Sequence, residues 1–211
     1  FPECHGATIV ELKNGDLVAS FFGGTKERNP DCCIWVCRKA KGAKEWTAPK
    51  LAADGVFALN DPNAEIAGID TACTPVKDTK GKLTARRKAC WNPVLFQIPG
   101  GDLILFYKIG LSVADWTGWL VRSKDGGKTW SKREALPQGF LGPIKNKPEY
   151  INGRIICPSS REGKGGWRIH FEYSDDKGKT WKTTESVPAE LSVPTQNRKK
   201  GGINVDDQEA G

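Results

Sequence analysis

Two stretches of the chain follow one plan, Arg122–Trp130 (RSKDGGKTW) and Tyr173–Trp181 (YSDDKGKTW). In each stretch a Ser and an Asp can hydrogen-bond the backbone of a turn, a Gly permits the turn, and a Trp packs beneath it. Two copies of S-x-D-x-G-x-T-W at matching offsets indicate an internal repeat. This repeat decides the expected fold.

A hairpin precedes each closing Trp. Apolar runs flank a tight-turn dipeptide in three segments: Asn14-Gly15, Gly100-Gly101 and Asn152-Gly153. These dipeptides tolerate the positive φ that two-residue hairpin turns demand. A second strand pair then leads to Trp46, Trp130 or Trp181, although residues 39–45 replace the box in the first copy. Each unit therefore has four strands, which is typical of a propeller blade.

The spacing of the closing Trp residues predicts the domain organisation. Trp130 and Trp181 are 51 residues apart, whereas Trp46 and Trp130 are 84 apart. The excess falls on an inserted loop, and long inserted loops often carry function. We expect a partial propeller over residues 1–190, followed by a flexible tail at 191–211. Its expected parts are blade one at 5–50, the insertion at 54–90, blade two at 91–136 and blade three at 143–187.

Composition excludes several classes of protein. The chain has 211 residues, of which 38% are hydrophobic and 27% charged, enough for a sizeable core. Its longest apolar runs fall far short of the ~20 residues of a spanning helix, so we expect no membrane span. The net charge of +7 is scattered, which disfavours a nucleic-acid partner. The chain begins at Phe1 and has no Met, as expected of a processed or partial product, and its compartment stays unknown.

The seven cysteines include no C-x-x-C pair and no His at zinc spacing, so the sequence predicts no metal and no cofactor. Cys33 and Cys37 share an apolar segment in which free Cys packs as a small hydrophobe. Cys73 and Cys90 flank the Lys-rich part of the insertion. They are a candidate disulfide in an oxidising compartment and free thiols otherwise.

Longer phrases around the boxes carry a family resemblance. They are CHGATIVE (4–11), FGGTKERNPD (22–31), CWNPVLFQ (90–97), FYKIG (106–110) and LGPIKNKP (141–148). Over about residues 3–187 the chain resembles the sialidase-like BNR, or Asp-box, repeat proteins of bacteria and plants, an exo-sialidase family. The resemblance implies an all-β, sialidase-like propeller of six blades with a glycan site at its axis. This chain accounts for about three of them.

The same resemblance implies a catalytic set. Enzymes of this design grip the substrate carboxylate with three arginines, use a Tyr paired with Glu as nucleophile, and use an Asp as acid/base. The resemblance places His5 where the first arginine usually stands and Asp31 near the acid/base Asp. The other arginines and the Tyr would come from later blades, so the catalytic set is incomplete in this chain.

Eight residues are the candidate site. Catalytic roles are predicted for Asp31 and Glu162, for which the alternatives are a turn cap and an ion pair with Arg161. Substrate binding is predicted for residues on loops expected to converge on the axis: His5, Lys26, Glu27, Asn92, Lys145 and Lys147. A surface ion pair is the alternative for Lys26 and Glu27.

Two functions follow from this site. The first is a glycoside hydrolase that acts on a terminal, acidic sugar of a glycan and takes further blades from a longer chain or a second copy. The second is a non-catalytic binding or assembly subunit, because an open propeller edge invites pairing with another chain in a homodimer or a larger complex.

Overall fold

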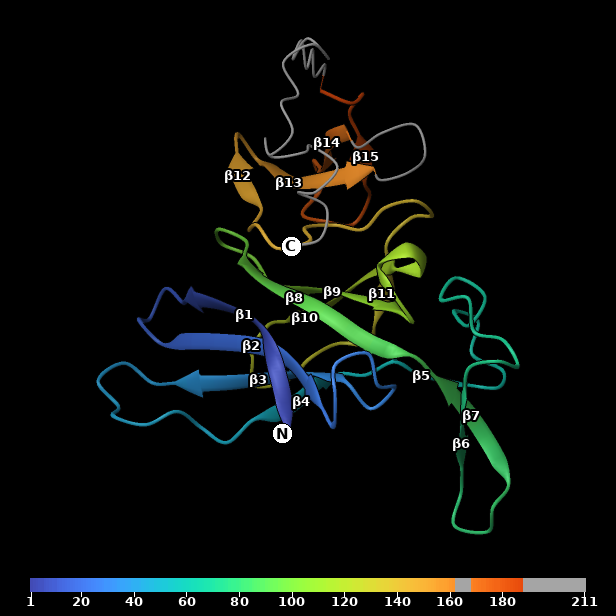
Figure 1. Cartoon of the computed structure of the whole chain (residues 1–211). Coiled ribbons are helices and arrows are strands. Elements are labelled where there is room, and N and C mark those ends of the chain that lie inside the picture. Colours follow the sequence, from blue (N-terminus) through green and yellow to red (C-terminus); the bar gives the residue numbers. More distant parts are fainter. Residues whose placement is uncertain (162–167, 188–211) are drawn as a thin grey trace, which may run out of the picture.

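Three four-stranded antiparallel sheets follow one another along the chain (Figure 1). The computed structural model describes residues 1–161 and 168–187, so the predicted tail at 191–211 lies outside the described residues. Within each sheet the strands pair in chain order, as in a propeller blade. The prediction of an all-β, partial three-bladed propeller is confirmed. The strands are β1 Glu3–Glu11, β2 Leu17–Gly24, β3 Cys33–Lys39 and β4 Lys50–Ala53; β8 Ala89–Gln97, β9 Leu103–Gly110, β10 Thr117–Ser123 and β11 Glu134–Ala135; β12 Glu149–Ile151, β13 Arg154–Arg161, β14 Arg168–Ser174 and β15 Lys182–Thr183.

The three dipeptides turn the hairpins as predicted. Gly15 connects β1 to β2 with φ of 84°, and Gly100 connects β8 to β9 with φ of 64°. Asn152 and Gly153 both have positive φ, 50° and 85°, between β12 and β13. Two positive φ values in a two-residue loop match the right-handed twist of the flanking strands.

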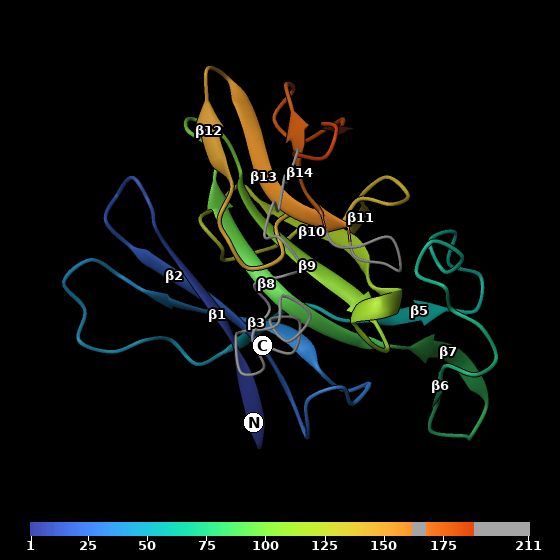
Figure 2. The same cartoon turned by 45° about the horizontal axis from the view of Figure 1, so that its top comes forward.

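Blade two lies between the other two blades, so both of its faces are buried (Figure 2). All residues of β9 are buried. Because side chains alternate along a strand, Leu105 and Tyr107 pack toward blade one, while Ile104 and Phe106 pack toward blade three. Double burial explains why this strand has a continuous apolar run rather than a polar alternation.

The two boxes are turn structures built by hydrogen bonds. In blade two, Ser123 Oγ accepts a hydrogen bond from Gly127 N at 2.7 Å and donates one to Asp125 at 2.8 Å. The Asp125 carboxylate also accepts from Thr129 Oγ1 at 2.6 Å and from the backbone N–H groups of Lys128 and Thr129. These bonds, led by the one from the Thr129 side chain, hold the pKa of Asp125 well below its usual range. Ser174, Asp176 and Thr180 repeat the pattern in blade three.

Each box turn also joins its blade to the preceding one. Gly126 has φ of 69°, and a Cβ there would lie 2.7 Å from the Leu12 side chain of blade one, so another residue would be strained. In the next join, Arg122 of blade two donates to Lys177 O at 3.0 Å and Gly178 O at 2.7 Å, in the box of blade three. The boxes therefore stabilise the propeller.

Asp125→Ala is expected to lower the free energy of unfolding by about 2 kcal/mol, because it removes the acceptor that orders the turn. Urea unfolding followed by Trp fluorescence measures the change. Asp78→Ala is the matched control, since Asp78 accepts two backbone hydrogen bonds in an exposed turn of the insertion that joins no blades. Equal losses in the two variants would contradict the joining role of the box.

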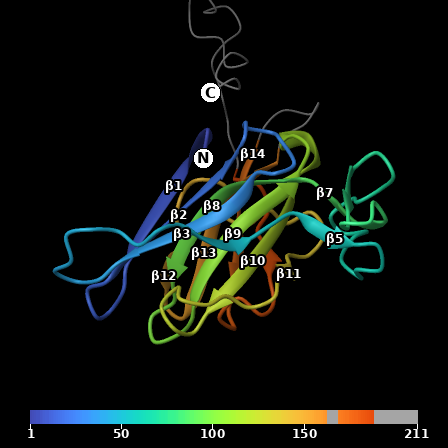
Figure 3. The same cartoon turned by 90° about the horizontal axis from the view of Figure 1, so that it is seen from below.

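The insertion differs from the expected loop, because it contains a three-stranded sheet of its own. Strands β5 Val56–Ala58, β7 Leu83–Arg87 and β6 Thr74–Lys77 pair in that order. The sheet projects from one side of the blades (Figure 3). Its alternating strand pattern is short, and the turn-forming residues between the strands conceal it in the sequence.

All seven cysteines are free thiols, so Cys73 and Cys90 do not form the candidate disulfide. Cys90 is fully buried, and burial raises the pKa of its thiol well above the usual value. Within residues 1–161 and 168–187, no helix has the length and apolar character needed to cross a membrane.

Candidate functional site

A cleft of about 1700 Å³ collects side chains from all three blades and from the insertion. His5 comes from β1, Glu27 and Arg28 from the β2–β3 loop, Asn92 from β8, and Arg161 from the end of β13. Further lining residues come from the insertion, from the segment between β9 and β10 and from the segment after β11, and they include Glu65, Ile66, Val113, Trp116, Phe140 and Lys145. Neither box contributes a residue. The cleft is therefore separate from the turns that hold the blades together.

The two strands β1 and β8 are both irregular where they reach the cleft. The pairing of β1 shifts between His5 and Thr8, and the pairing of β8 shifts between Trp91 and Val94. Asn92 lies in the second irregularity with φ of 37°, a left-handed value that asparagine tolerates better than most residues. Bulges re-aim side chains and are common beside functional sites. Here they accompany His5 and Asn92, which both line the cleft.

His5 and Glu27 form a pair at this wall of the cleft. His5 Nε2 lies 3.0 Å from the Glu27 carboxylate, and the imidazole packs on the Phe22 ring at 4.4 Å between centroids. The Glu3 carboxylate accepts a hydrogen bond from Glu27 N at 2.7 Å, which fixes the backbone beneath the pair. An oriented imidazole with a carboxylate partner can donate a proton to a ligand oxygen or accept one from it.

Asp31 holds the loop that carries this pair. Its two carboxylate oxygens accept hydrogen bonds from Thr25 N at 3.0 Å and from Thr25 Oγ1 at 3.1 Å. Asp31 is not among the residues that line the cleft. The arrangement is that of a turn cap, and the acid/base role of Asp31 stays a prediction.

The three predicted lysines lie in different surroundings. Lys145 lines the cleft with an exposed side chain, whereas Lys26 and Lys147 do not line it. The Lys147 ammonium donates to Ile9 O, so it ties the segment before blade three to β1. Glu162 lies outside the described residues, but its neighbour Arg161 lines the cleft.

Sequence reasoning missed the aromatic and apolar lining. Trp91 and Trp116 pack at 5.5 Å between ring centroids, and both line the cleft. Trp116 Nε1 is buried and has no hydrogen-bond partner among the described residues. The sequence did offer a signal for Trp91, because Trp91 directly precedes the predicted binding residue Asn92 in CWNPVLFQ (90–97). Nothing local marks Ile66 or Val113, since their place in the lining depends on how the insertion packs.

A buried ionic cluster lies behind the Phe140–Lys145 wall. Glu172 of β14 accepts hydrogen bonds from Leu141 N at 3.1 Å and Gly142 N at 2.6 Å. Lys108 of β9 is completely buried and donates to Pro143 O at 2.5 Å. Burial lowers the pKa of Lys108 to about 7, although the charge of Glu172 opposes the shift. The cluster therefore ties blades two and three to one wall of the cleft.

Comparison with known proteins gives the family. The family described as "BNR repeat-like domain" matches residues 15–200. The chain belongs to this family. None of the curated proteins compared with the chain matches it by sequence.

Solved structures share the fold of this BNR repeat chain. A protein of unknown function from Dyadobacter fermentans DSM 18053 is 19% identical with a TM-score of 0.63, and the match covers 89% of this chain and 56% of that one. The sialidase of Trypanosoma rangeli in complex with sialic acid is 16% identical with a TM-score of 0.54, with 88% and 31% covered. The α-L-arabinanase of Penicillium chrysogenum complexed with arabinobiose is 19% identical with a TM-score of 0.55, with 91% and 52% covered.

The chain thus spans about half of the first structural relative and a third of the sialidase. At these identities the likeness concerns the fold, and function must be argued from the site. In the described part of the chain, no group of three or more His, Cys, Asp or Glu is arranged to hold a metal ion.

Proposed function

We propose that the cleft is a glycan-binding site and that, with further blades, the chain acts as a sialidase-like glycoside hydrolase on a terminal, acidic sugar. The observation that carries this proposal is the convergence of polar side chains from three blades on one cleft. The fold shared with a sialidase and an arabinanase supports it. The further blades come from a longer chain or from a second copy.

Charge supports an acidic sugar. Arg28, Lys145 and Arg161 offer three cations to the cleft, and a guanidinium can bind a carboxylate through two parallel hydrogen bonds. His5 and Glu27 are the groups best placed to handle a proton. Asp31 remains the acid/base candidate from the family resemblance, and Glu162 remains the second predicted catalytic carboxylate. Asn92 is a hydrogen-bonding partner for sugar hydroxyls, whereas Lys26 and Lys147 stay predicted binding residues from the sequence that do not line the cleft.

Turnover of a fluorogenic sialoside tests the catalytic part of the proposal. We expect the wild-type chain to be active when its molecular mass in solution is that of an assembly with a closed ring of blades. If Asp31 transfers the proton, Asp31→Asn should lower the activity about 100-fold or more. His5→Gln is the matched comparison for the alternative proton donor. Sugar binding without turnover would overturn hydrolysis by this chain and retain the binding function.

Lys145→Met is expected to weaken binding of sialic acid and galacturonic acid about tenfold, because it removes a cation from the lining of the cleft. Calorimetric titration measures the effect, and the methyl esters of both sugars should bind the variant and the wild type alike. Lys80→Met, in an exposed turn of the insertion, is the control. An equal loss for the acids and their esters would contradict a carboxylate contact.

An assembly role is the second candidate, and exposed apolar side chains on blade three favour it. Ile169 and Phe171 are 56% and 36% exposed and lie on one face of β14, opposite to the face that packs on blade two. A face of this kind suits another blade, supplied by a second copy or by a larger complex. Sedimentation of the wild type and Phe171→Ser tests it. A concentration-dependent dimer that the substitution weakens would support this role.

A further inference from the structure

The insertion supplies one wall of the cleft. Glu65 and Ile66, from the turn-rich segment between β5 and β6, line it together with Val113 and Trp116 from the segment after β9. The two segments are far apart in sequence. The contacts between these segments therefore determine whether the wall keeps a fixed shape.

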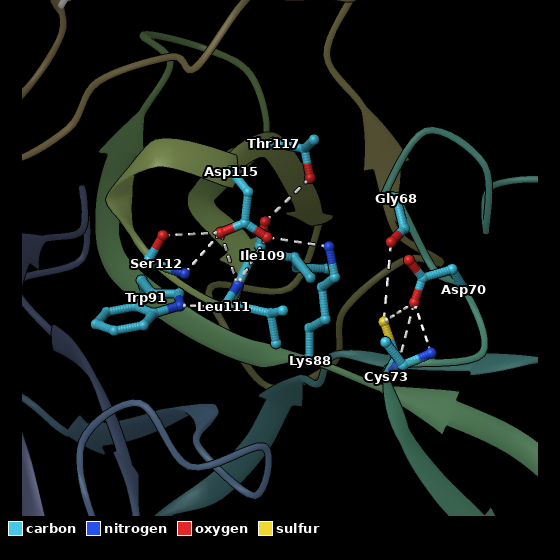
Figure 4. A network of polar contacts seen from close by, with 12 residues as sticks. Gly68, Asp70, Cys73, Lys88, Trp91, Ile109, Leu111, Ser112, Asp115 and Thr117 are labelled. Carbon is cyan, nitrogen blue, oxygen red and sulfur yellow. Dashed lines mark hydrogen bonds and ion pairs between the residues drawn. The ribbon is translucent and has the colours of Figure 1, made fainter.

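An ion pair between Lys88, at the end of the insertion, and Asp115 links the insertion to the second of these segments (Figure 4). The Lys88 ammonium is 3.1 Å from the Asp115 carboxylate, and the Lys88 side chain is only 6% exposed. Asp115 also accepts hydrogen bonds from Leu111 N and Ser112 N at 2.9 and 2.6 Å, which close the turn that carries Val113. On the other side, a Cβ at Gly68 would lie 3.2 Å from the Lys88 ammonium. Lys88 thus fills the space between the insertion and the Ser112–Asp115 turn.

The base of the insertion is anchored as well. Phe57 of β5 is fully buried and packs on Trp119 of blade two at 5.6 Å between ring centroids. Arg133 lies over the Phe57 ring at 4.2 Å and donates to Asp54 O and Val56 O. The insertion is therefore fixed to blade two at two places, its base and Lys88.

The fixed wall presents apolar side chains to solvent. Ile66 is 45% exposed and Val113 is 56% exposed, and both line the cleft. Exposed apolar surface that is held in place and faces a cleft commonly marks a contact with a ligand. Glu65 adds a carboxylate, which accepts hydrogen bonds from hydroxyl groups and repels an acidic group.

The size of the cleft indicates how much ligand it can take. Pockets for drug-sized ligands measure roughly 300–1,000 Å³, whereas this cleft measures about 1700 Å³. The cleft therefore has room for more than one sugar residue.

Resting on the proposed glycan function, we propose that Glu65, Ile66 and Val113 form a subsite for the second residue of the bound glycan, a neutral sugar. The C–H face of that sugar packs on Ile66 and Val113, and one of its hydroxyls donates to Glu65. Lys88 and Asp115 are positioning residues for this subsite. The cations at Arg28, Lys145 and Arg161 hold the terminal acidic sugar.

The test compares binding of sialic acid with that of sialyllactose, whose second residue is neutral. Calorimetry of the wild-type chain should give about tenfold tighter binding of sialyllactose. Ile66→Ser combined with Val113→Ser should abolish this gain and leave the affinity for sialic acid unchanged. Leu59→Ser combined with Leu111→Ser is the control, because these side chains are 58% and 49% exposed in the same segments but do not line the cleft.

Lys88→Met tests the positioning role. It should also abolish the gain, with faster hydrogen exchange in residues 59–73 and 111–117, whereas Lys88→Arg should restore both. Equal affinities of the wild type for the two sugars, or an equal loss for both in the Ser variants, would overturn the subsite alone. Absence of binding of either sugar to the wild type would overturn the proposed glycan function together with the subsite.

Discussion

Glu172→Ala is expected to lower the free energy of unfolding by about 3–5 kcal/mol, the cost of removing one partner from a buried ionic cluster. Glu172 is 1% exposed, and its carboxylate accepts the N–H groups of Leu141 and Gly142. The substitution leaves both donors unsatisfied and removes the carboxylate that lies 3.5 Å from His170 Nε2. Each of these changes is destabilising.

Urea unfolding at pH 8 measures this loss, and Glu149→Ala is the control because Glu149 is exposed in the same blade. The control should stay within about 0.5 kcal/mol of the wild type. A double-mutant cycle with Lys108→Met measures the coupling between these two buried side chains apart from the loss of the acceptor for the two backbone N–H groups. A loss under about 1 kcal/mol in Glu172→Ala would show that the cluster does not hold blades two and three together.

The fold was largely predictable because its decisive signals are local. Turn geometry at Asn152-Gly153 needs positive φ, and the box at Ser123–Trp130 closes on itself through bonds between residues at most four apart. Such patterns specify each hairpin before any blade packs on another. The double burial of β9 was also visible as the apolar run Leu103–Tyr107.

The candidate site was only partly predictable, because its members meet through packing between blades. His5, Glu27, Asn92 and Lys145 were named from the sequence and line one cleft. Asp31 was named for chemistry, yet the structure engages both of its carboxylate oxygens with Thr25. A match to a family sequence motif identifies the position of a residue, but it does not show which neighbours the side chain hydrogen-bonds in the folded chain.

The wall formed by the insertion could not be predicted from the sequence either, because it too depends on packing between distant segments. Lys88 reads as one more member of a basic run, and only the packed structure shows that it meets Asp115. Lys108 did leave a signal. Side chains alternate between the two faces of β9, so Lys108 lies on the same face as Ile104 and Phe106. This alternation places the Lys108 side chain between blades two and three.

Lys108 should make the stability of the protein depend on pH in a way that identifies it. Burial lowers its pKa from 10.5 to about 7, so between these values the unfolded chain binds a proton that the folded chain lacks. Stability is therefore lost as pH falls toward 7, with a slope of up to about 1.4 kcal/mol per pH unit. Burial raises the pKa of the Cys90 and Cys157 thiols, so their contribution is lost as pH rises above about 9.

The free energy of unfolding should consequently rise from pH 7 to about pH 8.5 and fall again at higher pH. Lys108→Met removes the only group to which the rising limb is assigned, so this limb should flatten while the alkaline fall remains. Urea unfolding under reducing conditions at four pH values between 6.5 and 9.5 measures both limbs, with Lys82→Met as the exposed control. If the rising limb persists in Lys108→Met, another group produces it and the assignment of this limb to Lys108 is wrong.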